Sequence, residues 1–343
     1  MANEFGLIDH EMLQSHYMLE YIKLVDQPEG FLNEKYFPSK GVDTNIVQWE
    51  TEFQHAGLAQ YIDKGGKPNR TNKKASTLSW QEVAYKKESE FLSANDLRWK
   101  RKEGSQAIKT MSDQIQEVQD YLNRRIVNRN EWEFINAMRG TMAIKTASGS
   151  TVTLDYKIPS TNKIDISGQS GDVWTNAAAD ILSQLMTYKE AVRFEGDAEL
   201  ILMTSDYLIN AMSKNTSLLA HLGEKAKEQI ATEGRLTRIM GMDIVPYNAR
   251  YSAEYNNASP NLPPELIRFS KKNEIFILPK NKPIGKRPVA ATEESGGVGQ
   301  RFMYAWEQKG HEWGTWILAG EYSLPIIQNR WGFLYGIVSA DPG

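Results

Sequence analysis

Two runs of basic residues are the parts of this sequence best suited to bind a ligand by charge. The first lies in residues 63–74, which carry one anion and the five cations Lys64, Lys67, Arg70, Lys73 and Lys74. The second is Arg98-Trp99-Lys100-Arg101-Lys102, whose cations are Arg98, Lys100, Arg101 and Lys102. Ammonium and guanidinium groups pair with phosphate, so either run could contact a nucleic acid. The alternative is a solvated loop or a charge that faces another protein. That alternative fits the first run better, whereas the second run suits both interpretations.

Motifs for catalysis, nucleotide binding or metal binding are not found in the sequence. His311-Glu312-Trp313 lacks the second histidine of a metalloprotease motif, and Gly65-Gly66-Lys67-Pro68 lacks the upstream glycine and the Ser/Thr of a phosphate-binding loop. Gly296-Gly297-Val298-Gly299 precedes β-rich sequence, whereas a dinucleotide site needs a helix there. We therefore expect no enzyme activity, no cofactor and no metal site.

Composition restricts the class of protein further. The 343 residues include 40 Lys and Arg against 43 Asp and Glu, so the net charge of −3 excludes a globally basic protein that coats DNA. The absence of cysteine excludes disulfides, thiolate metal sites and thiol catalysis. No apolar run approaches the length of about 20 residues that crosses a bilayer, and no signal peptide is recognised at the N-terminus. We expect a soluble cytosolic protein with no membrane partner.

Two alternating stretches flank the first basic run. Residues 47–53 alternate apolar and polar side chains, and a second alternating stretch extends from Thr77 to Phe91. Alternation of this kind predicts half-buried strands. Because the residues between them are polar and include Gly65, Gly66 and Pro68, we predict an extended hairpin with an exposed tip.

A long amphipathic helix is predicted over residues 105–139. Its apolar positions are spaced by three and four residues, and Ser105 and Gly140 are the expected N-cap and C-terminal stop. Thirty-five residues would span about 50 Å. The apolar repeat is too short to indicate a coiled coil, so we predict a single helix that lies across a sheet. The predicted core face consists of Ile108, Met111, Ile115, Val118 and Leu122.

The second half of the chain predicts a mixed α/β lobe followed by aromatic-rich strands. Short apolar strands are expected at 200–203, 242–247 and 274–279, with a helix from Tyr207 to Met212 that Ser205 or Asp206 caps. Alternating aromatic residues between Phe302 and Ile337 predict two or three further strands. We expect these strands to return to the first sheet, beside the long helix.

This order of elements, together with several local sequences, resembles the tailed-phage major capsid proteins of the lambda-type protein E family, which have the Hong-Kong-97-like shell fold. The resemblance rests on Tyr36-Phe37-Pro38, on the 107–138 helix with Arg124-Arg125, and on Lys282-Pro283-Ile284-Gly285 and Leu324-Pro325-Ile326-Ile327. It implies an α+β fold with an N-terminal arm (1–38), an extended β-hairpin loop (39–95), a peripheral domain with the spine helix (96–165 and 295–343) and an α/β axial domain (166–294).

The resemblance also implies a function. It indicates a head protein that assembles with itself into hexamers and pentamers of an icosahedral shell around double-stranded DNA. Implied partners are a scaffolding protein, a portal and a cement protein, with weak contact to packaged DNA. The chain would be made in the host bacterial cytoplasm and reside in the virion capsid. In that setting the 64–74 cations would contact a neighbouring subunit, and the 98–102 run would lie near the inner surface. The alternative is a cytosolic nucleic-acid-binding protein that uses the same two basic runs.

Overall fold

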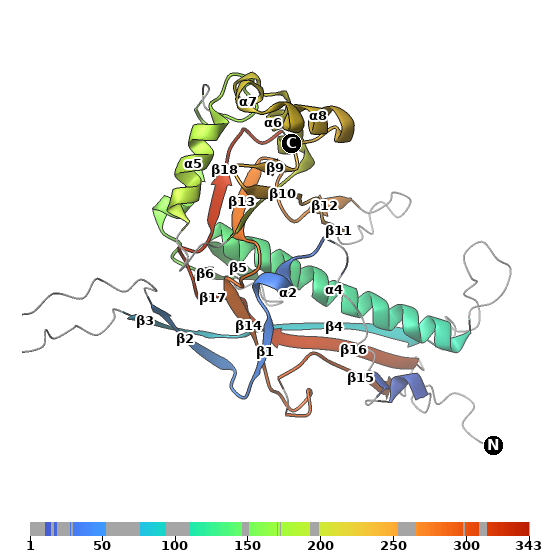
Figure 1. The fold of residues 1–343 in the computed structure, drawn as a ribbon. Coiled ribbons are helices and arrows are strands. Elements are labelled where there is room, and N and C mark those ends of the chain that lie inside the picture. Colours follow the sequence, from blue (N-terminus) through green and yellow to red (C-terminus); the bar gives the residue numbers. More distant parts are fainter. Residues whose placement is uncertain are drawn as a thin grey trace, which may run out of the picture.

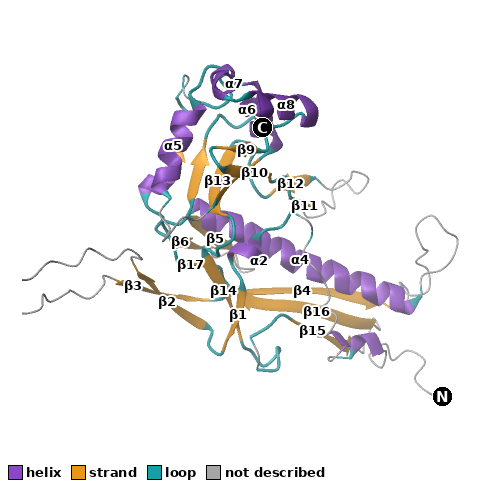
Figure 2. Ribbon diagram, viewed as in Figure 1, coloured by secondary structure: helices purple, strands orange, loops and turns teal. Residues whose placement is uncertain are grey.

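The computed structural model describes residues 11–14, 17–18, 28, 30–52, 76–93, 110–145, 151–169, 171, 173–192, 199–252, 265–297, 299–308 and 314–342. Figure 1 shows two bodies joined by one long helix, with a hairpin that extends away from both. In Figure 2 most of the shorter helices gather in the upper body, and the long strands lie in the lower body.

The lower body is a six-stranded sheet. Its main path runs β1 (Ser39–Val42), β14 (Gly285–Ala290), β16 (Gly314–Ser323) and β15 (Phe302–Gln308). Strand β17 (Ile326–Ile327) pairs with β14, and β4 (Ala84–Ser93) pairs with β16 over ten residue pairs. Thus β15 and β16 return to the sheet beside the long helix.

The long helix, α4, extends from Met111 to Arg139 and lies across this sheet (Figure 1). It begins six residues later than predicted, because Thr110 and not Ser105 is its N-cap. The Asp113 N–H donates to Thr110 Oγ1 and the Thr110 N–H donates to Asp113 Oδ2, which satisfies two backbone donors of the first turn. The helix ends where predicted: Gly140 takes the left-handed conformation, with φ of 95°.

The upper body is a second six-stranded sheet in the order β7 (Lys163–Asp165), β18 (Leu334–Ile337), β13 (Glu274–Pro279), β8 (Leu200–Thr204), β10 (Met242–Pro246) and β9 (Arg238–Ile239). The predicted strands at 200–203, 242–247 and 274–279 are confirmed. The helices around this sheet are α5 (Ile181–Ala191), α6 (Asp206–Lys214), α7 (Thr216–His221) and α8 (Glu224–Glu233). Ser205 caps α6 by accepting from the Leu208 N–H, as predicted.

Three strands lie in a different sheet from the one expected: β7 and β18 in the upper sheet and β14 in the lower sheet. The C-terminal strand β18 pairs with β13 and β7 in the upper sheet, so the expectation that all the terminal strands return to the first sheet is wrong. Conversely, β14 pairs in parallel with β1 and belongs to the lower sheet. The chain therefore crosses from the upper to the lower body between β13 and β14, and returns to the upper body before β18.

The remaining elements are short. The hairpin strands are β2 (Ile46–Glu52) and β3 (Ser76–Glu82), and two further two-stranded sheets are β5 (Thr141–Lys145) with β6 (Thr151–Asp155) and β11 (Arg250–Ser252) with β12 (Leu266–Arg268). The helix α2 (Asn33–Tyr36) and the 3-10 turns η2 (Glu11–Leu13) and η3 (Ser160–Asn162) complete the described elements.

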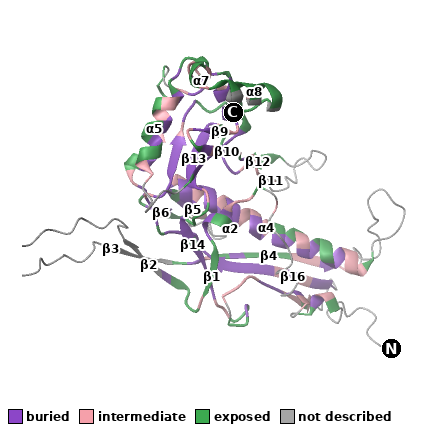
Figure 3. Ribbon diagram, in the orientation of Figure 1, coloured by how far each residue is buried: buried purple, intermediate pink, exposed green. Residues whose placement is uncertain are grey.

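Three apolar clusters hold these parts together. One lies inside the upper body, and one lies under the N-terminal half of α4. The third joins the C-terminal half of α4 to both sheets, with Phe134, Phe276 and Leu324 among its buried members. Figure 3 shows burial concentrated where α4 meets the sheets and exposure along its outer side. The long helix α4 and the two sheets are therefore packed together as one unit.

Candidate assembly surfaces and the polar joint behind them

The hairpin β2–β3 projects from the body and pairs with no other strand among the described residues (Figure 1). Its register aligns Ile46 with Glu82 and Glu52 with Ser76. The alternation from Thr77 to Phe91 predicted one strand, but the structure divides it at Val83 into β3 and β4. The Val83 N–H donates to the Asn45 carbonyl at 3.0 Å, and its side chain is buried. The hairpin tip, with Lys64, Lys67, Arg70, Lys73 and Lys74, lies outside the described residues.

The apolar stripe of α4 faces the lower sheet. Ile115, Val118 and Leu122 are buried, and Met111 is partly buried, in a cluster that includes Leu92 of β4 and Ile317 of β16. Ile108 and the basic run of Arg98, Lys100, Arg101 and Lys102 lie outside the described residues. The stripe therefore joins α4 to the two longest strands of the sheet.

A buried polar joint continues this contact toward the C-terminal half of α4. We use this name for Lys86, Asn130, Glu133, Arg287, Arg301, Glu321 and Ser323. The Lys86 ammonium lies at its centre and donates to Asn130 Oδ1 at 2.7 Å, Glu133 Oε2 at 2.8 Å and Ser323 Oγ at 2.7 Å. These acceptors come from α4 and β16, so one side chain of β4 is bonded to both neighbours. Burial lowers the pKa of Lys86, while Glu133 and Glu321 act in the opposite direction.

Glu321 of β16 forms ion pairs with the other two cations of the joint, Arg287 and Arg301. Arg301 donates to it from Nε at 2.9 Å, and Arg287 Nε lies 3.7 Å from its carboxylate. Burial alone would raise the pKa of Glu321, but Arg287, Arg301 and Lys86 outweigh burial and hold this pKa well below its ordinary value. A buried charge costs several kcal/mol unless it is paired. The joint meets this cost by pairing every carboxylate with a cation.

A further buried carboxylate, that of Glu131 in α4, attaches the N-terminal segment to this helix. Glu131 accepts from the backbone N–H groups of Leu32 and Asn33, at 3.0 Å each, at the start of α2. The Tyr247 hydroxyl donates to it at 2.5 Å. Burial raises the pKa of Glu131 to about 7, against the effect of these hydrogen bonds. Three segments distant in sequence therefore meet at one side chain.

Sequence reasoning missed the polar joint, although a signal for it is present. Glu321 lies in phase with Ile317 and Ala319 on the buried face of β16, and Asn130 follows Ile126 by one helical turn. A charged or amide residue in phase with an apolar stripe indicates a buried polar contact. Its partners come from strands far away in sequence, so periodicity does not identify them.

Within the part of the chain that the structure describes, no group of three His, Asp or Glu residues could hold a metal ion. None of the described helices is long and apolar enough to cross a membrane.

Solved structures with the same arrangement are capsid shells and phage proteins. A prophage protein from E. coli CFT073, assigned as a capsid protein, has a TM-score of 0.64 at 13% identity, with 95% of this chain and 99% of that chain covered. A phage-related protein from Bordetella bronchiseptica RB50 has a TM-score of 0.55 at 12% identity, with 95% and 97% covered. The capsid of the cyanophage P-SCSP1u has a TM-score of 0.55 at 11% identity, with 92% and 90% covered. The fold is accordingly the Hong-Kong-97-like shell fold.

The family follows from the sequence itself. The model of the family described as phage major capsid protein E matches residues 15–332, so the chain belongs to that family. It is a head shell protein of a tailed phage and a component of the virion capsid. No curated protein matches the sequence.

Proposed function

We propose that copies of this chain form hexamers and pentamers that close an icosahedral shell around double-stranded DNA. The observation that carries this proposal is the isolated hairpin β2–β3, which has no partner strand among the described residues. A two-stranded hairpin by itself is only marginally stable in water. A neighbouring subunit that covers it would supply the missing contacts, and a closed shell gives every copy such a neighbour.

The parts of the subunit keep the roles that the resemblance implies. Residues 1–38 act as the N-terminal arm and 39–95 as the extended loop. The peripheral domain consists of 96–165 without β7 and 295–343 without β18, together with β14. The axial domain consists of 166–294 without β14, together with β7 and β18. This division moves three strands to the domain whose sheet they join. Strands β1 and β4, within 39–95, also belong to the lower sheet and attach the extended loop to the peripheral domain.

The tip cations Lys64, Lys67, Arg70, Lys73 and Lys74 contact acidic groups of an adjacent subunit in this proposal. A groove between β4 and α4 is lined by Glu88, Glu90 and Glu117 and by one cation, Arg125, which pairs with Glu88, so the groove keeps an excess of negative charge. The charge of the groove is complementary to that of the tip, which makes it the counterpart we propose.

Charge reversal at the tip tests this contact. Replacing Lys73 and Lys74 with Glu should leave the melting temperature almost unchanged but reduce the yield of particles seen by negative-stain microscopy. The double variant Lys73→Gln and Lys74→Gln removes both charges without reversing them. It serves as the control and should reduce the yield of particles less. Normal particle yield in the Glu variant would remove the tip from the interface.

The run of Arg98, Lys100, Arg101 and Lys102 lies near the inner surface in this proposal and makes weak, sequence-independent contact with DNA. A bulky reagent that reacts with amines, added to filled particles, should modify Lys100 and Lys102 more slowly than the lysines of residues 64–74. Equal rates of modification would place the run on the outside.

The chain acts as a structural protein without catalytic activity, and a scaffolding protein, a portal and a cement protein are its proposed partners during assembly in the host cytoplasm. The competing function is that of a soluble nucleic-acid-binding protein. That function predicts tight, salt-sensitive binding by a monomer and no particles. Negative-stain images of the purified or scaffold-co-expressed protein separate the two functions.

A further inference from the structure

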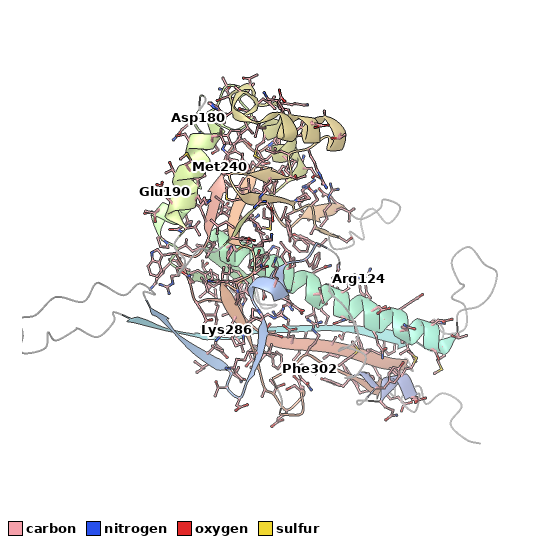
Figure 4. The ribbon with its side chains drawn as sticks, in the orientation of Figure 1. Arg124, Asp180, Glu190, Met240, Lys286 and Phe302 are labelled. Carbon is pink, nitrogen blue, oxygen red and sulfur yellow. The ribbon has the colours of Figure 1, made fainter. Side chains whose placement is uncertain are left out.

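A groove of about 590 Å³ lies between α4 and the hairpin β11–β12. One wall consists of α4 residues that include Arg124, and the other consists of residues 249–252 and includes Arg250. Figure 4 shows Arg124 on the side of α4 toward this hairpin. Both arginines are exposed at the groove, and Asp120 is the carboxylate among its lining residues.

A third guanidinium lies on the strand next to one wall of this groove, although it is not itself a lining residue. Arg268 of β12 is the direct cross-strand partner of Arg250 in the antiparallel pair β11–β12. Like charges directly opposite each other destabilise a sheet unless an opposite charge lies near them. Burial and the adjacent Arg250 both lower the pKa of Arg268, which reflects this repulsion.

The Arg268 side chain is held in place by a chain of two hydrogen bonds. Its Nη1 donates to Asn248 Oδ1 at 2.8 Å, and Asn248 Nδ2 donates to Asp206 Oδ2 at 2.5 Å at the start of α6. By contrast, neither Arg124 nor Arg250 forms an ion pair with a carboxylate in the described residues. One arginine is thus oriented by the fold, while its two neighbours keep their donors available.

We propose that Arg124, Arg250 and Arg268 bind the phosphate backbone of a nucleic acid at the groove between α4 and β11–β12. Guanidinium groups bind phosphate through paired hydrogen bonds, and three of them from three elements suit a ligand with repeated negative charges. The partly exposed rings of Phe31 and Tyr251 also line the groove. Three arginines beside one carboxylate make the site positive, as nucleic-acid interfaces are, and a parallel titration with an acidic peptide distinguishes a protein partner. The proposal rests on the proposed function for the source of the ligand, the enclosed DNA.

The test is a titration of a fluorescent DNA duplex with purified protein, followed by anisotropy at several salt concentrations. The variant is Arg124→Gln with Arg250→Gln, which removes two cations without adding an anion. The matched control is Arg235→Gln with Arg238→Gln, which makes the same charge change at exposed positions near β9 of the upper body. A phosphate contact contributes about 0.9 to the slope of log affinity against log salt. We therefore expect affinity to fall about tenfold and the slope to fall by about two in the first variant only.

Other results would overturn the assignment. Equal loss in both double variants would show a general charge effect, and unchanged binding in the first would show that the groove is no phosphate site. A fluorescent poly-glutamate peptide is titrated in parallel. Tighter binding of this peptide than of DNA, lost in the first variant alone, would assign the groove to an acidic protein segment instead.

Particle formation is scored on the same proteins by negative-stain microscopy. If the wild type forms no particles, the proposed function fails while the DNA titration still decides the groove. If the wild type and the variant both form particles and bind DNA equally, the groove assignment alone fails.

Discussion

The guanidinium of Arg139 and the carboxylate of Glu274 are joined by two hydrogen bonds, from Nε at 2.9 Å and from Nη2 at 2.8 Å. Arg139 is the last residue of α4 and Glu274 is the first residue of β13, so this pair fastens the long helix to the upper sheet. The Tyr335 hydroxyl and the Lys271 N–H also donate to Glu274. Burial would raise the pKa of Glu274, but Arg139 outweighs burial and lowers it.

We predict that Glu274→Ala lowers the free energy of unfolding by about 3–5 kcal/mol, because it leaves the largely buried Arg139 without its counter-charge. Urea denaturation measures this change. The control is Glu199→Ala, whose carboxylate pairs with Lys280 at the surface and is 66% exposed; it should cost about 1 kcal/mol or less. Similar losses for the two variants would show that the Arg139–Glu274 pair contributes no more to the free energy of unfolding than an exposed ion pair does.

The apolar stripe of α4 gives the second prediction. Ile115 is fully buried between α4 and the lower sheet. Ile115→Ala should lower the free energy of unfolding by about 2–5 kcal/mol by opening a cavity, and Ile115→Asp should give insoluble protein. Gln116→Ala, one residue away on the exposed side, should change it by about 0.5 kcal/mol or less. A soluble Asp variant that still forms particles would contradict the burial of this face.

The pH dependence of stability gives the third prediction. The pKa of Glu131 is about 7 in the folded chain against 4.5 for an ordinary glutamate, so the folded state holds a proton that the unfolded state loses between these values. The free energy of unfolding should therefore fall as the pH rises from about 4.5 to about 7, by about 3 kcal/mol from this group. Glu131→Gln should remove that slope.

The measurement is urea denaturation of both proteins across this pH range. The carboxylates whose pKa is lowered, Glu274 and Glu321 among them, lose their stabilising effect only below about pH 4.5. The difference between the two proteins above that pH therefore reports on Glu131. Parallel curves for the wild type and Glu131→Gln would show that Glu131 is ionised throughout.

The contact between Gly41 and Gly299 gives the fourth prediction. A Cβ atom at Gly299 would lie 2.2 Å from the Val289 carbonyl oxygen and 2.6 Å from the Gly41 Cα. Gly299→Ala should therefore cost about 1–3 kcal/mol by forcing β1 and β14 apart from the turn that covers them. Gly168→Ala, where a Cβ meets no atom within 4 Å, is the matched control and should be near neutral. A neutral Gly299→Ala would show that this turn is not packed against β1.

Local patterns predicted α4, the hairpin and the short strands of the upper body, because each depends on a period within a dozen residues. The sequence also contains a signal for the start of α4, because Thr110 and Asp113 have the spacing of a capping box. Ser105 was predicted as the N-cap instead because it directly follows Gly104, which suggests a boundary. The partner of β18 was not predictable in this way. Its residues are apolar and aromatic like those of β16, and only the tertiary arrangement decides which sheet each strand joins.

The break at Val83 has a mechanical consequence. Strands β3 and β4 follow one another along the long axis of the lower sheet (Figure 1), and β4 is held by ten residue pairs to β16. Tension on the hairpin acts along β4 and not across it, so it loads this whole ladder at once in shear instead of peeling its pairs apart one by one. The Lys86 ammonium donates hydrogen bonds to α4 and β16. These bonds would have to break before β4 could slide along its neighbours. We infer that a subunit built in this way resists a pull on its hairpin through the whole length of β4.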